Sequence, residues 1–171
     1  MALVANEQNN SSQETDGMEI FIQAGELYFG NAPTVVSTMQ HSRIVISFWH
    51  PETRVGGLCH IIKIMSPSNV KDMQYADFAI NEYAELAKKY GMSVNEYEVR
   101  VFGGRVKDES DARKHEIALD SISKLLKQAG FKTCELDAFI TSSRKIKLNL
   151  ANGQVTRNLI GDVDSQGRQV A

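Results

Sequence analysis

The sequence predicts a layered α/β (α+β) sandwich with mostly antiparallel sheets and two main helices. Three observations lead to this fold class. Short runs rich in Val, Ile, Phe and Tyr are frequent, only two stretches have helical spacing, and the strand-like runs come in clusters instead of alternating singly with helices. A doubly wound parallel sheet would require that alternation. A chain of 171 residues with 42% hydrophobic side chains can bury one core.

Seven segments have the composition of strands. They lie at about 18–23, 43–50, 54–62, 95–102, 132–138, 144–150 and 153–160. The turn-forming residues His50-Pro51-Glu52-Thr53 separate the second segment from the third, so we expect these two to pair as a hairpin. Asn152-Gly153 predicts another tight hairpin near the end of the chain.

Two helices are expected between the strands. The first runs from about Asn69 to Tyr90, with apolar side chains spaced three and four apart and Gly91 at the place of a C-cap. The second begins with Ser110 or Asp111 as N-cap and ends before Gly130.

The two ends of the chain lack these patterns. Residues 1–17 are polar and rich in Asn, Gln and Ser, which predicts a disordered N-terminal tail. Residues 161–171 are expected to form a flexible C-terminal tail. The expected domain organisation is therefore a single folded domain over 18–160.

Composition also excludes several classes of protein. No apolar run approaches the ~20 residues that span a bilayer, so we do not expect membrane insertion. The first Lys or Arg is Arg43, so the sequence shows no basic signal region, and only two cysteines are present. Both features favour a cytoplasmic location. A net charge of −2 gives no basic surface for nucleic acid.

Metal and cofactor motifs are absent from the sequence. The four histidines are not closely paired with one another or with cysteine, so we expect no metal. Phe102-Gly103-Gly104 does not continue into a phosphate-binding motif, and we expect no cofactor. Cys59 and His60 are neighbours on one predicted strand and should point to opposite faces. A buried Cys59 would then be an inert core residue.

Several ordered landmarks resemble the CheD family, the chemoreceptor glutamine deamidases of bacterial chemotaxis. The longest is FIQAGELYFGNAPTVVSTMQHSRIVISFWHPETRVGGLCHI. It is followed by Tyr75-Ala76-Asp77-Phe78-Ala79-Ile80, by Phe102-Gly103-Gly104, by Asp137 and Arg144, and by Gly153. The resemblance extends over about 18–160, nearly the whole predicted domain.

The resemblance implies a cysteine amidohydrolase that converts receptor glutamines to glutamates without a cofactor. Carried over by position, the family's catalytic His is His60 and its Thr is Thr38. The implied partners are the cytoplasmic domains of methyl-accepting chemoreceptors and, in some bacteria, a CheC-type phosphatase. Such chemistry needs a thiolate to attack the amide, an imidazole to move protons and donors for the oxyanion.

The chain departs from the family at the nucleophile. The family's L-G-S-C-V stands here as Gln40-His41-Ser42-Arg43-Ile44, so Arg43 occupies the cysteine position. An arginine stays protonated in proteins and cannot attack a carbonyl. Neighbouring motifs also differ, at Lys63-Ile64-Met65, Arg105 and Phe139-Ile140.

Three interpretations follow. The first is a pseudo-deamidase that binds receptors or chemotaxis partners without covalent chemistry. The second is an active deamidase with Cys59 as relocated nucleophile, and the third is a binding protein with a different target. Ser42 could be proposed as a substitute nucleophile. Adjacent positions on a strand face opposite sides, however, so Ser42 would not point to the side on which Arg43 points. We expect Arg43 to lie within reach of His60 and to lower the pKa of that imidazole.

Overall fold

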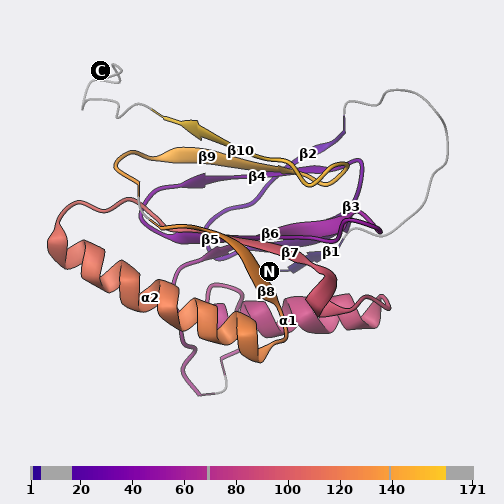
Figure 1. Ribbon diagram of the computed structural model, residues 1–171, viewed down its shortest axis with the longest axis horizontal. Coiled ribbons are helices and arrows are strands. Elements are labelled where there is room, and N and C mark those ends of the chain that lie inside the picture. The colour runs from indigo at the N-terminus through magenta and orange to yellow at the C-terminus, as the bar shows by residue number, and fades with distance from the viewer. Residues whose placement is uncertain (1, 5–16, 69, 139, 161–171) are drawn as a thin grey trace.

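The computed structural model describes residues 2–4, 17–68, 70–138 and 140–160. These residues form three layers: a six-stranded sheet lies between a four-stranded sheet and two helices (Figure 1). Five of the eight strand pairs are antiparallel. The predicted α+β sandwich with mostly antiparallel sheets is therefore confirmed.

The strand order of the larger sheet is β1-β3-β6-β5-β7-β8, and that of the smaller sheet is β10-β9-β4-β2. The larger sheet contains β1 (Ala2–Val4), β3 (Leu27–Asn31), β5 (Ile44–Trp49), β6 (Val55–Ile61), β7 (Glu98–Phe102) and β8 (Lys132–Asp137). The smaller sheet contains β2 (Glu19–Phe21), β4 (Val35–Gln40), β9 (Arg144–Asn149) and β10 (Val155–Leu159). The predicted hairpin of residues 43–50 and 54–62 is confirmed as the antiparallel pair β5–β6.

Helices α1 (Ala76–Lys89) and α2 (Glu109–Gln128) cover the outer face of the larger sheet, and a short helix η1 (Val94–Glu96) precedes β7 (Figure 1). Gly91 and Gly130 follow the two long helices with φ of 77° and 93°, as expected for helix ends. No helix among the described residues is long and apolar enough to cross a membrane.

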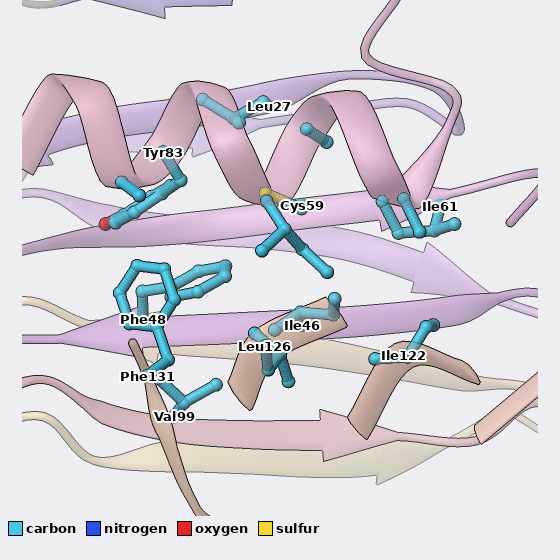
Figure 2. Close-up of a cluster of buried hydrophobic side chains, with 14 of the residues drawn as sticks. Leu27, Ile46, Phe48, Cys59, Ile61, Tyr83, Val99, Ile122, Leu126 and Phe131 are labelled. Carbon is cyan, nitrogen blue, oxygen red and sulfur yellow. The ribbon is translucent and has the colours of Figure 1, made fainter. Parts of the chain in front are cut away.

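Two apolar clusters hold the three layers together. One lies between the larger sheet and the helices and includes Phe48, Cys59 and Tyr83 (Figure 2). The other lies between the two sheets and includes Val36 and Leu58. Because β5 and β6 are buried on both faces, their alternate side chains belong to different clusters.

Some predicted elements need correction. The strand prediction missed β3, which Gly30 interrupts, and β4, whose buried Ser37 and Thr38 give it a polar composition. Residues 2–4 were expected in a disordered tail, but their backbone pairs in parallel with β3, which offers them an unpaired sheet edge. The rest of residues 1–16 and all of 161–171 lie outside the described residues.

Both helix starts also differ from the prediction. Helix α1 begins at Ala76 and not near Asn69, because an Asp72 carboxylate oxygen accepts a hydrogen bond from the Gln74 amide and forms a local turn. Helix α2 begins at Glu109 with Asp108 as its N-cap, whose carboxylate accepts a hydrogen bond from the Asp111 amide at 2.9 Å. The predicted caps Ser110 and Asp111 are therefore wrong by two or three residues.

Candidate functional site

Strands β4 and β6 bring Thr38 and His60 together between the two sheets. Thr38 is wholly buried, and His60 is only 3% exposed. The Thr38 hydroxyl oxygen lies 2.8 Å from His60 Nδ1 and 2.8 Å from the carbonyl oxygen of Ile22. Two of the predicted site residues, which are 22 positions apart in sequence, therefore form one hydrogen-bonded pair.

This arrangement determines the tautomer of His60. A carbonyl group can only accept a hydrogen bond, so the Thr38 hydroxyl uses its single proton to donate to the Ile22 carbonyl oxygen. The hydroxyl oxygen must then accept from His60, which places the imidazole proton on Nδ1. In the part of the chain that the structure describes, Nε2 has no hydrogen-bond partner. His60 thus presents an unprotonated nitrogen, as a general base requires.

Burial controls the charge of His60. The pKa of His60 is lowered to about 4, first because burial disfavours the imidazolium and then because His41 and Arg43 place positive charge nearby. The direction agrees with the expectation from Arg43, although burial and not Arg43 is the main cause. At neutral pH the His60 ring is therefore uncharged.

Cys59 points away from this pair. It is wholly buried in the cluster between the larger sheet and the helices, among Leu27, Ile46 and Ile61 (Figure 2). His60 lies on the opposite face of β6, where it contacts Thr38 of the smaller sheet. Burial raises the pKa of the Cys59 thiol well above its ordinary value. This geometry and this pKa both oppose a role for Cys59 as nucleophile.

The loop that carries residue 43 accepts hydrogen bonds at three consecutive carbonyl groups. The carbonyl oxygens of His41 and Ser42 accept from the Arg105 amide at 2.6 Å and from His115 Nε2 at 3.0 Å. The carbonyl oxygen of Arg43 accepts from the Gln40 amide group at 2.7 Å. The loop before β5 is therefore held by side chains or backbone from three different places in the chain.

A buried polar network supports the same loop. In addition to its hydrogen bond to the Arg43 carbonyl oxygen, the Gln40 side chain donates to the carbonyl oxygen of Phe102 at 2.6 Å and accepts from Arg144 Nε at 2.8 Å. Arg144 also donates to the Asp137 carboxylate at 2.5 Å and to the carbonyl oxygen of Gly103 at 3.1 Å. Asp137 and Arg144, two landmarks of the family resemblance, thus act as positioning residues.

The Phe102-Gly103-Gly104 segment passes close to the loop. A Cβ atom on Gly104 would lie 2.4 Å from the Ser42 carbonyl carbon and 2.7 Å from the Arg43 amide nitrogen. Only glycine permits this approach. His41 has no such requirement, because Arg54 is the only non-glycine among the described residues with a positive φ.

Arg43 directly precedes β5, in which Val45 pairs with His60. Its side chain is exposed, and its Nη1 donates to the carbonyl oxygen of Ile62 at 3.2 Å. Arg43 and Ser42 line a pocket of about 400 Å³ beside α2, and His60 is not among the residues that line it. Arg43 therefore influences His60 through its charge, while its guanidinium lies at a neighbouring surface.

The other histidines and motif positions that the sequence singled out contact neighbouring residues of the fold. His50 Nε2 lies 3.3 Å from a Glu96 carboxylate oxygen, and His41 Nδ1 lies 2.6 Å from the Ser143 hydroxyl. Ile140 forms an isolated bridge with Arg105, while Phe139 lies outside the described residues. Within the described residues, no group of three or more His, Cys, Asp or Glu side chains is placed to hold a metal ion.

Sequence reasoning missed the supporting residues Gln40 and His115. Gln40 occupies a position where the family motif has an apolar residue, and no local pattern shows that its amide lies beside residues more than 60 positions away. His115 is one histidine on an otherwise solvated helix face. Its bond to Ser42 spans 73 positions and appears only in the folded chain.

Comparisons with known proteins give a consistent result. The family model described as "CheD chemotactic sensory transduction" matches residues 63–158. A probable chemoreceptor glutamine deamidase CheD from Pseudomonas savastanoi is 31% identical over 150 residues, which cover 80% of this chain and 82% of that protein. Any stretch of four-fifths of this chain includes residues 38–60, so this match includes the candidate site.

Two other known proteins are similar to this chain. A probable chemoreceptor glutamine deamidase CheD 1 from Chromobacterium violaceum is 27% identical, over 83% of this chain and 78% of that protein. Among solved structures, the hypothetical protein YfiH of Bacillus licheniformis is similar with a TM-score of 0.48 and 10% identity, over 67% of this chain and 51% of that one.

Proposed function

Because the chain belongs to the CheD family, we propose that it binds methyl-accepting chemoreceptors in the cytoplasm without deamidating their glutamines. The observation that carries the proposal is Arg43, which stands where the family motif has its nucleophilic cysteine. The curated relatives are named as probable chemoreceptor glutamine deamidases. This chain retains their framework and lacks the group that would attack the amide.

The missing step is the covalent one. Deamidation through a cysteine requires a thiolate to attack the glutamine carbonyl, ammonia to leave, and water to release the thioester. A guanidinium has no free electron pair with which to attack. The hydroxyl group of Thr38 donates its one hydrogen bond to the Ile22 carbonyl oxygen and not to His60. The described loop therefore holds a residue that can donate hydrogen bonds but cannot form an acyl intermediate.

His60 alone does not replace the nucleophile. With a pKa of about 4, it is a weak base toward water, because a good general base has a pKa near the working pH. Its fixed tautomer suits the activation of an adjacent thiol, and among the described residues the nearest cysteine in sequence, Cys59, points into the core. Direct hydrolysis by a His60-activated water is thus not expected.

The build of the loop supports a binding role. Hydrogen bonds hold the 41–43 loop at three carbonyl groups, and the buried Gln40–Arg144–Asp137 network supports the same loop. A loop held in this way presents Arg43 to a partner in a fixed position. A CheC-type phosphatase, the other partner that the resemblance implies, would be a second candidate for the same surface.

The test combines binding and ammonia release. Purified protein is mixed with the cytoplasmic fragment of a chemoreceptor, binding is measured by isothermal titration calorimetry, and ammonia is measured in the same mixture. We expect saturable binding and no ammonia above the fragment alone. The Pseudomonas savastanoi relative serves as the positive control for ammonia release. Ammonia production that is lost in His60→Gln would contradict the proposal, and so would the absence of binding.

A further inference from the structure

The pocket beside Arg43 lies at the junction of three elements. Its volume is about 400 Å³. Its lining comes from the loop before β5 and the start of β5, from the end of β6 with the residues after it, and from the first half of α2 with Lys107 before it. Helix α2 runs along the outer face of the larger sheet (Figure 1). The residues that line the pocket include Arg43 and Ser42 of the loop before β5.

The rim of the pocket is positively charged. Arg43, Lys107 and Lys114 contribute cations, and Asp111 contributes the one carboxylate. Asp111 lies 4.0 Å from Lys114, so this pair is approximately neutral. Among the described residues, neither Arg43 nor Lys107 has an ion-pair partner. Two positive charges therefore remain for a ligand.

Part of the pocket wall is apolar. The buried Ile44 and Ile61 line the pocket, together with the half-buried Ile62 and Ala118. Such a wall suits the methylene groups of a short side chain, while the rim suits a terminal anion. A glutamate side chain has both parts.

Arg43 is held in place for such a contact. One guanidinium nitrogen donates to the Ile62 carbonyl oxygen, which leaves its other N–H groups available. The backbone of the loop is fixed at Ser42 by His115 and at Arg43 by Gln40. A positioned arginine can form two parallel hydrogen bonds to a carboxylate, whereas a glutamine amide offers it a single acceptor oxygen and no charge.

We propose that this pocket binds the side chain of glutamate, in preference to glutamine, on the receptor's cytoplasmic helices. The inference rests on the proposed function for the identity of the partner and on the pocket alone for the class of ligand. The chain would then bind the deamidated form of the receptor more tightly than the amidated form, with Arg43 as the residue that determines this specificity.

The test separates the ligand class from the partner. Receptor cytoplasmic fragments carrying glutamate or glutamine at their modification sites are titrated into the full chain. We expect the glutamate form to bind about tenfold more tightly, which corresponds to one charge-assisted interaction of about 1.4 kcal/mol. Arg43→Gln should remove this preference. Arg113→Gln, an equal loss of charge at an exposed α2 position that does not line the pocket, should preserve it.

A second arm uses no receptor. Blocked glutamate and blocked glutamine, each as an N-acetyl amide, are added to ¹⁵N-labelled protein, and we expect glutamate alone to shift the amides of Ser42, Lys114 and His115. Equal effects of both compounds would overturn the inference. Glutamate-specific shifts without receptor binding would support the pocket and contradict the proposed partner. Equal binding of both receptor forms would support the partner and overturn the pocket's preference.

Discussion

At His60, burial and one hydroxyl group together determine the protonation state and the tautomer. The ring is 3% exposed, and its Nδ1 donates to Thr38, which itself donates to Ile22. These contacts leave Nε2 as the ring nitrogen that can accept a proton. Under the proposed function, Arg43 stands where a thiol would supply that proton. The pair Thr38–His60 would then be a base without its nucleophile.

The low pKa of His60 predicts a pH-dependent stability. Between the ordinary histidine pKa of 6.5 and the folded value of about 4, the unfolded chain binds a proton that the folded chain does not. Stability therefore decreases as the pH falls through this window, by up to about 3 kcal/mol from this residue. Urea unfolding of wild type and His60→Gln at several pH values would measure the difference. A His60 NMR titration with a midpoint above 6.5 would contradict this account.

Removing the Thr38 hydroxyl should release the imidazole. In Thr38→Val the shape is kept, but His60 Nδ1–H and the Ile22 carbonyl lose their partner in a buried site. We expect a loss of about 1–3 kcal/mol in unfolding free energy and a mixed tautomer in the ¹⁵N spectrum of His60. Thr156→Val, the same change at an exposed position of β10, should alter stability by less than about 0.5 kcal/mol. An unchanged tautomer in Thr38→Val would be evidence against the inferred bonding.

Strand β6 explains why two adjacent residues have unrelated roles. Alternation sends Cys59 into the helix-covered core (Figure 2). The next residue, His60, points the other way and contacts Thr38 of the smaller sheet. We expect a thiol reagent to label one cysteine in the native protein, the exposed Cys134, and both in denaturant. In Cys134→Ser the native protein should show no rapidly reacting thiol. Rapid labelling of Cys59 in that variant would revive the relocated-nucleophile hypothesis.

Helix α2 depends on its N-cap for the position of its first turns, which line the pocket. Asp108→Ala removes the acceptor for the Asp111 amide and should lower the unfolding free energy by about 1 kcal/mol, measured by urea denaturation. Asp120→Ala removes a carboxylate from the exposed middle of the same helix and only an ion pair with Lys124, so its effect should be about 0.5 kcal/mol or less. Equal losses in the two variants would mean that the cap does not stabilise α2.

Local sequence patterns were sufficient to predict elements that are specified by residues adjacent in the chain. The β5–β6 hairpin and the Asn152-Gly153 turn have apolar strands and turn residues that specify them directly, and the structure contains both. Strand β4 was missed because Ser37, Thr38 and Gln40 are buried polar residues whose partners lie on other strands. The site was predictable only through the family resemblance, because Thr38 and His60 meet across two sheets.

Across the whole molecule, Gln40 and Arg144 connect the two sheets. Both residues belong to the smaller sheet, and they donate hydrogen bonds to Phe102, Gly103 and Asp137 of the larger sheet or its adjoining loop. The connection also fixes the loop at residue 43 through Gln40. Packing of the two layers and the shape of the site are therefore coupled.

Breaking this connection should cost more than losing a surface ion pair. Arg144→Leu leaves the Asp137 carboxylate and the Gln40 oxygen without their buried partner, and we expect a loss of about 3–5 kcal/mol in unfolding free energy. Arg157→Leu removes a more exposed arginine that lies 3.4 Å from the same carboxylate, and it should cost about 1 kcal/mol. Chemical denaturation of both variants would compare them, and similar costs would argue against the coupling of the two sheets.

The central claim is that Arg43, at the position of the family's cysteine, prevents this chain from deamidating receptor glutamines. Mass spectrometry of receptor cytoplasmic fragments, incubated with wild type, Arg43→Cys, and Arg43→Cys with His41→Gly, tests it most directly. We predict unmodified glutamines with wild type and His60-dependent conversion to glutamate with at least one cysteine variant. The single variant is included because His41 needs no positive φ. Conversion by wild type that disappears in Cys59→Ser or His60→Gln would contradict the account.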